Sequence, residues 1–274
     1  MYVEYYVEYV GLNVWVSWVN ITLMDILGYI IVFTFLGSVV SLIGGVILLA
    51  KEKFAIKISH FLAAFAGGAL LGTAFFDLLP EAMEASEGRE VNIYLWALMG
   101  VLIFFLLERF IHHHDQSNDP SEKKTVVPLI IIGDSVHNFI DGVAIAATFL
   151  ISIPLGIVTS LAVAAHEIPQ EIGDFGLLLH KGVARKKVLL INFYSALAAM
   201  AGAILTYLAK DSIENLLPVA MSLTSGFFIY IALANLIPEI HSREDQKQAF
   251  WETICLLLGV VVIYITISLL EGKA

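Results

Sequence analysis

Two neighbouring apolar stretches with unusual polar residues decide the fold: residues 133–146 (GDSVHNFIDGVAIA) and residues 162–176 (AVAAHEIPQEIGDFG). Each lies within a longer apolar run, 125–150 and 153–180. Both runs are long enough to cross a bilayer, because about 20 residues of helix span the hydrocarbon core. An ionisable side chain inside a membrane costs about 2.5–3.5 kcal/mol on insertion scales, so such residues indicate function. The stretches therefore predict two membrane-spanning helices that carry a polar site.

Six further apolar runs surround these two in the sequence: 26–50, 58–80, 91–107, 188–209, 216–238 and 253–270. The chain is 59% hydrophobic and only 15% charged, whereas about a quarter of the residues in a soluble domain are charged. We therefore predict an all-α membrane protein with eight transmembrane helices. The net charge of −10 argues against a nucleic-acid partner, which requires a basic surface. The lipid bilayer is the expected surrounding.

The distribution of Lys and Arg predicts the orientation of these helices, because basic residues gather in cytoplasmic loops. If the N-terminus is outside, the inner loops and their flanks hold all basic residues of the chain except Arg89, Lys210 and Lys273. Both termini are then expected outside. We expect residues 1–24 to form an external segment and residues 25–271 a single transport domain, with a cytoplasmic loop at 111–124.

The polar residues of the two stretches are spaced for one shared site. His137 and Asp141 stand four residues apart, as do His166 and Gln170, so each pair lies on one helical face. Imidazole, carboxylate and amide groups together suit a divalent ion such as zinc, with cadmium, iron and manganese as rivals. The predicted metal-site residues are His137, Asn138, Asp141, His166, Glu167, Gln170 and Glu171. The alternative is a structural network of interhelical hydrogen bonds, but so many polar residues on two adjacent helices favour a metal site.

Other polar residues suggest a path to and from this site. Asp134 and Asp174 lie inward of the two histidines and point to a cytoplasmic exit. Asp77 and Glu81 flank Pro80 at the outer end of the second span; they could collect cations or form an ordinary solvated helix end. The inner loop carries His112, His113 and His114, and such a run either binds metal or is a solvated tail.

A short internal similarity relates helices that run in opposite directions. Residues 77–81 (DLLPE) resemble residues 235–239 (NLIPE), and the motif at His137 (HNxxD) resembles the motif at His166 (HExxQ). Inverted repeats with a polar site near the bilayer midplane are typical of carriers that work by alternating access. The similarity supports a carrier, but the sequence alone separates a carrier poorly from a channel or a metal sensor. Saturable flux with trans-stimulation would favour the carrier.

At these motifs the sequence resembles the ZIP (Zrt/Irt-like protein) family of metal-ion transporters. Residues 137–142 (HNFIDG) and 166–174 (HEIPQEIGD) carry the resemblance, and the second motif is similar to the HExPHExGD signature of one animal subfamily, with Gln170 at the second histidine. The resemblance implies zinc import into the cytoplasm, a three-two-three helix arrangement, homodimers and an elevator-like movement. We expect a multi-pass protein of the cell membrane, specifically of a prokaryotic plasma membrane.

The resemblance also implies roles for individual residues. His137, Asp141, His166 and Gln170 would form a primary metal site, and Asn138 and Glu167 would line a second one. Some bacterial members complete that second site with an acidic residue on the sixth helix, whereas residues 195–200 (SALAAM) contain none. Asp141 stands where many relatives have the longer glutamate.

Two other classes of protein compete with this interpretation. An intramembrane metalloprotease requires HExxH on an unbroken helix, but Gln170 replaces the second histidine and Pro169 is expected to interrupt the helix. A metal/proton exporter usually has fewer spans, and the direction of flux would distinguish it. We therefore expect no enzyme and no cofactor apart from the transported ion, and the single cysteine, Cys255, excludes a thiolate cluster.

Overall fold

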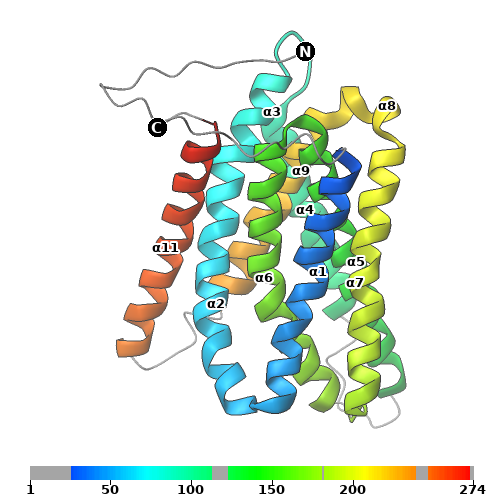
Figure 1. The fold of residues 1–274 in the computed structure, drawn as a ribbon, viewed down its shortest axis with the longest axis vertical. Coiled ribbons are helices and arrows are strands. Elements are labelled where there is room, and N and C mark those ends of the chain that lie inside the picture. Colours follow the sequence, from blue (N-terminus) through cyan, green and yellow to red (C-terminus); the bar gives the residue numbers. More distant parts are fainter. Residues whose placement is uncertain (1–25, 113–122, 181, 239–245, 272–274) are drawn as a thin grey trace.

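The computed structural model describes residues 26–112, 123–180, 182–238 and 246–271, and these form a bundle of long helices (Figure 1). The predicted external segment 1–24, together with His113 and His114, lies outside the described residues. The long helices are α1 (Ile26–Ala50), α2 (Glu52–Thr73), α4 (Ile93–His112), α5 (Lys123–Ile151), α6 (Ile153–His180), α7 (Arg185–Leu208), α9 (Leu217–Tyr230) and α11 (Gln246–Glu271). The prediction of an all-α protein with eight long helices is therefore confirmed for the described residues.

Shorter elements extend and connect these helices. A π-helical turn, Ala74–Leu78, joins α2 to α3 (Leu79–Ala85), and a second π-helical turn, Ile231–Leu236, continues α9. The small helix α8 (Lys210–Ile213) and a 3₁₀ turn, Glu214–Leu216, lie between α7 and α9.

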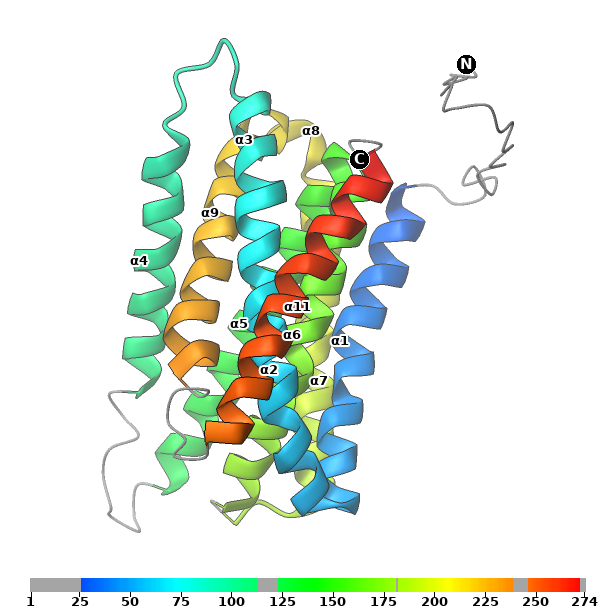
Figure 2. The ribbon, with the colours of Figure 1, turned by 90° about the vertical axis from the view of Figure 1, so that its left-hand side faces the viewer.

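The surface of the bundle is that of a multi-pass membrane protein. Successive long helices alternate in direction, and α1 begins at the same end of the bundle where α11 ends (Figures 1 and 2). Large apolar side chains such as Phe35, Leu208 and Leu269 are exposed, while charged side chains such as Asp141 and Glu167 are buried. Five described segments are long and apolar enough to cross a membrane: Ile26–Ala50, Glu52–Ala85, Arg185–Leu208, Leu217–Leu236 and Gln248–Leu270.

Contacts divide the long helices into two groups of four. Helices α1, α5, α6 and α7 pack mainly against one another and form what we call the α5–α6 group. Helices α2, α4, α9 and α11 form the second, the α2–α9 group, which includes α3. The two groups meet chiefly where α2 packs against α6.

Glycines permit the closest helix contacts within each group. A Cβ atom on Gly142 of α5 would lie 1.9 Å from the carbonyl oxygen of Ala199 in α7. A Cβ atom on Gly68 of α2 would lie 1.9 Å from the carbonyl oxygen of Leu256 in α11. Small residues let membrane helices approach at their backbones, so these glycines set the spacing in both groups.

The two π-helical turns fall on the internal similarity found in the sequence. Each turn ends shortly before a proline, Pro80 in one segment and Pro238 in the other. The segments run in opposite directions through the bundle (Figure 2). Matching backbone irregularities thus accompany the matching DLLPE and NLIPE sequences.

Helix α6 differs from the expectation at Pro169. The helix continues from Ile153 to His180 with Pro169 inside it, because the ring removes one hydrogen bond while neighbouring helices support the backbone on both sides. The expected interruption is therefore wrong. The argument against a metalloprotease rests on Gln170 alone.

Candidate metal centre

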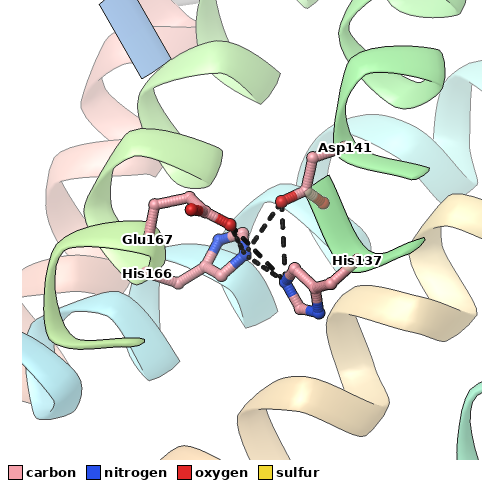
Figure 3. A group of neighbouring side chains, drawn as sticks. All are labelled: His137, Asp141, His166 and Glu167. Atoms are coloured by element: carbon pink, nitrogen blue, oxygen red, sulfur yellow. Dashed lines mark hydrogen bonds and ion pairs between the residues drawn. The ribbon is translucent and has the colours of Figure 1, made fainter. Parts of the chain in front are cut away.

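Helices α5 and α6 bring four potential metal ligands together in the interior of the bundle (Figure 3). His137 and Asp141 lie one turn apart on α5, and His166 and Glu167 are consecutive on α6. One ligand atom from each residue lies within 4.8 Å of all the others, and all four residues are buried. We call these residues the four-residue cluster.

Distances within the four-residue cluster suit a small ion. The Nε2 atoms of His137 and His166 are 3.1 Å apart, and His166 Nε2 is 3.3 Å from Asp141 Oδ2. Glu167 Oε1 is 3.7 Å from His137 Nε2 and 3.8 Å from His166 Nε2. Ligands about 2.0–2.1 Å from a tetrahedral zinc ion are about 3.3 Å from each other. The four distances above therefore differ by about half an ångström or less from the separation of ligands around such an ion.

The backbone of α6 orients the imidazole of His166. Its Nδ1 atom is 3.1 Å from the carbonyl oxygen of Ala162, one turn earlier. The carbonyl oxygen can only accept a hydrogen bond, which Nδ1–H must donate, so this contact favours the tautomer in which Nε2 carries the lone pair. Such an outer contact is typical of histidines that ligate metal ions.

The carboxylates of the four-residue cluster lack ordinary hydrogen-bond donors. Among the described residues, Asp141 Oδ2 and both carboxylate oxygens of Glu167 accept no hydrogen bond, although these atoms are inaccessible to solvent. Buried charges are normally paired or bound to a metal ion. The donor set of two imidazoles and two carboxylates therefore fits a divalent cation.

The remaining predicted site residues on α5 and α6 lie next to this cluster. Asn138 donates a hydrogen bond from Nδ2 to Asp134 Oδ1 at 3.0 Å. The side chain of Gln170, which we expected in the primary site, approaches the same Asp134 carboxylate. Glu171 is buried, and neither of its carboxylate oxygens accepts a hydrogen bond from a described residue. Glu167 lies in the four-residue cluster instead of at a separate second site.

The predicted pathway residues other than Asp134 lie farther away along the helices. Asp174 follows Glu171 on α6 and is partly exposed, while Asp77 is buried in the π-helical turn that follows α2. Glu81 is partly exposed on α3. His112 ends α4, but its side chain, like His113 and His114, is outside the described residues.

Sequence reasoning did not identify an aromatic side chain beside the four-residue cluster. The ring of Phe104 in α4 meets the ring of His137 edge-on at a centroid distance of 5.3 Å. Phe228 of α9 approaches His166 in the same manner at 6.3 Å. Phenylalanine is common in any apolar span, so nothing in the sequence marked these two residues.

Comparisons with known proteins place most of this chain in one family. A family model described as "ZIP Zinc transporter" matches residues 27–127 and 112–266. Zinc transporter ZIP13 of Pongo abelii is 34% identical over 215 residues, which cover 73% of this chain and 64% of that protein. Zinc transporter zipt-7.2 of Caenorhabditis elegans is 29% identical over 264 residues, covering 74% of this chain and 57% of that protein. Zinc transporter ZIP4 of Mus musculus is 39% identical over 157 residues, covering 56% of this chain.

The chain spans less than two thirds of the length of the first two relatives. These relatives come from animals, so they do not support the expected prokaryotic plasma membrane. The family is one of transporters, in agreement with the prediction of a non-enzymatic membrane protein. The match over nearly all of the described helices shows that this chain belongs to the ZIP zinc transporter family.

Proposed function

We propose that this protein moves divalent transition-metal ions, with zinc preferred, across a membrane through the four-residue cluster. The observation that carries the proposal is the convergence of two imidazoles and two carboxylates within 4.8 Å between α5 and α6. This convergence occurs in the interior of a multi-pass bundle whose family is named for zinc transport.

The chemistry of the cluster suits an ion that has to leave again. Thiolate ligands select zinc strongly, whereas imidazole and carboxylate groups select it less strongly. The only cysteine of the chain, Cys255, lies on α11, outside the four-residue cluster. Cadmium, iron and manganese accept overlapping ligands, so we expect them to compete with zinc.

Uptake into the cytoplasm by alternating access is the proposed mode of transport. Exposed basic residues, including Lys51, Lys57 and Lys186, gather at the end of the bundle where α1 and α6 finish, which supports a cytoplasmic location for that end. The two helix groups and the opposed π-helical segments support a movement of the α5–α6 group against the α2–α9 group. We further propose a three-two-three helix arrangement, a homodimer, and both termini on the outer face of a cell membrane.

Uptake of radiolabelled zinc into proteoliposomes tests this function. We expect saturable uptake by the wild-type protein, at least a tenfold loss in His166→Ala, and inhibition by excess cadmium, iron or manganese. Glu252→Gln is the matched control, because Glu252 is a fully buried carboxylate on α11, outside the four-residue cluster.

Other outcomes would point to the competing functions. Export from preloaded vesicles without uptake would favour an exporter. Cleavage of a membrane peptide that is abolished by Glu167→Gln would favour a protease. Normal uptake by His166→Ala would remove the four-residue cluster from the transport path.

A further inference from the structure

Exposed basic side chains gather at one end of the bundle, where α1 leads into α2 and where α7 begins (Figure 1). Six of them form what we call the basic surface: Lys51, Lys53, Lys57, Arg185, Lys186 and Lys187. In the segments that carry them, 49–59 and 182–194, Glu52 is the only acidic residue. The basic surface therefore has a strong positive charge.

A shared apolar cluster lies beneath the two basic segments. Leu48 of α1, Ala55 of α2 and Val188 of α7 are buried in one cluster together with Phe175 and Leu178 of α6. Helix α1 contacts both α2 and α7. The basic side chains therefore surround one packed unit. This unit joins α2 of the α2–α9 group to three helices of the α5–α6 group.

The charges of the basic surface are not neutralised by other described residues. The ion pairs found in the described part of the chain join members of the four-residue cluster, and none involves a residue of the basic surface. All six side chains are exposed. Their positive charges are therefore accessible to an anion outside the protein.

Large apolar side chains are exposed directly beside these charges. On α2, Phe54 is 53% exposed and lies between Lys53 and Lys57 in the sequence. On α7, Leu190 is 47% exposed and follows Lys187 by about one helical turn. A soluble anion gains nothing from apolar neighbours, whereas a phospholipid presents a charged headgroup next to its acyl chains. The combination therefore favours a lipid.

We infer that the basic surface binds the headgroups of anionic phospholipids, with Phe54 and Leu190 against their acyl chains. The cytoplasmic leaflet, in which the proposed orientation places this end of the bundle, carries anionic lipids that attract clustered Lys and Arg residues. Because the basic surface includes residues of both helix groups, the bound lipids connect the α1–α2 junction with the start of α7. The inference does not rest on metal transport.

Native mass spectrometry of the purified full-length chain in a neutral detergent tests this inference. The probes are phosphatidylglycerol and phosphatidylcholine with the same acyl chains, so that they differ in the charge of the headgroup. We expect the wild-type protein to bind phosphatidylglycerol roughly tenfold more tightly. The double variants Lys53→Gln/Lys57→Gln and Lys186→Gln/Lys187→Gln should each weaken this binding roughly fivefold or more, because each removes two positive charges.

A matched control removes two exposed charges at the opposite end of the bundle. Arg89 follows α3 and Lys210 begins α8, and both side chains are exposed (Figure 2). Arg89→Gln/Lys210→Gln should therefore bind phosphatidylglycerol like the wild type. Since every substituted side chain is exposed, all three double variants should melt within a few degrees of the wild type in phosphatidylcholine nanodiscs, which shows that they fold.

The contrary outcomes are specific. Equal affinity of the wild type for the two lipids, or unchanged affinity for phosphatidylglycerol in both variants of the basic surface, overturns the inference. A loss in only one of these variants overturns a surface shared by the two helix groups. Inorganic phosphate that displaces phosphatidylglycerol at equal concentration indicates a site for soluble anions and overturns the assignment to lipid. Zinc uptake into phosphatidylcholine proteoliposomes tests the proposed function separately.

Discussion

The two helix groups both bury charged residues, but they arrange them differently. In the α5–α6 group, two carboxylates and two imidazoles converge within 4.8 Å. In the α2–α9 group, Asp77 lies in the π-helical turn near α3, whereas Glu252 lies near the start of α11, at the opposite end of the bundle (Figure 2). Convergence of potential ligands, and not burial of charge alone, therefore distinguishes the candidate metal centre.

The two helix groups also differ in the regularity of their backbones. Helices α5 and α6 remain α-helical through Pro128 and Pro169, while α2 and α9 are each followed directly by a π-helical turn. Turns of this type often occur at functional sites and permit local changes in helix register. The ligands of the α5–α6 group thus lie on regular α-helices, whereas the two π-helical turns lie in the α2–α9 group.

The largest expected effect comes from removing an imidazole of the four-residue cluster. His137→Ala or His166→Ala should reduce zinc uptake at least tenfold, because each change leaves the ion with three ligands and exposes unpaired carboxylates to one another. Uptake into proteoliposomes and insertion into the membrane are measured on the same preparations. Normal uptake by both variants would place the transport site outside the α5–α6 group.

A second prediction separates packing from ligand placement. Gly142→Ala should lower both the melting temperature and uptake, since the new Cβ would collide with the backbone of Ala199 beside Asp141. Overpacking of this kind costs about 1–3 kcal/mol. Gly68→Ala, which collides with Leu256 in the α2–α9 group, should lower the melting temperature with a smaller loss of zinc affinity.

Matched glycine changes serve as controls for this prediction. A Cβ on Gly173 meets nothing within 4 Å, and one on Gly67 makes only ordinary contact with Leu236. Both Gly173→Ala and Gly67→Ala should therefore melt within a few degrees of the wild type. Equal destabilisation by all four substitutions would contradict the role of close backbone contacts.

A smaller effect is expected where the α2–α9 group touches the metal centre. Phe104→Leu removes the edge-on contact with His137, and such aromatic contacts contribute about 0.5–1.5 kcal/mol. Zinc affinity should fall roughly two- to tenfold. Phe105→Leu changes the adjacent, more exposed ring and should leave zinc affinity unchanged; an equal loss in both variants would rule out a specific role for Phe104.

The smallest effect should come from the histidine run. Replacing His112, His113 and His114 with alanine should leave the maximal rate of zinc uptake largely intact, because the run begins at the end of α4 whereas the four-residue cluster lies on α5 and α6. Dose–response curves for zinc would reveal any change in regulation. A tenfold lower maximal rate would instead make the run part of the transport path.

The sequence predicted the eight helices because each apolar run has the length of a membrane span. It also identified the polar residues of α5 and α6, since charged groups stand out against apolar neighbours. It did not predict that α6 continues through Pro169, that Glu167 joins His137, or that Gln170 turns to Asp134. These details depend on the relative rotation of packed helices, which the spacing of residues along one helix does not determine.

The π-helical turns illustrate the same limit. The DLLPE and NLIPE segments were visible as a repeat, but a π-helical turn requires a local hydrogen-bond shift that neighbouring helices stabilise. The contact of Phe104 with His137 likewise joins α4 to α5 through packing alone. Residue type reveals which groups are costly to bury, and the fold reveals which of them meet.

X-ray absorption at the zinc edge, measured on purified protein with one equivalent of bound zinc, tests the central claim most directly. The account predicts two imidazole nitrogens and carboxylate oxygens at about 2.0–2.2 Å from the ion, with one imidazole fewer in His166→Ala. A bound zinc ion without any imidazole ligand would contradict the claim that the four-residue cluster holds the transported ion.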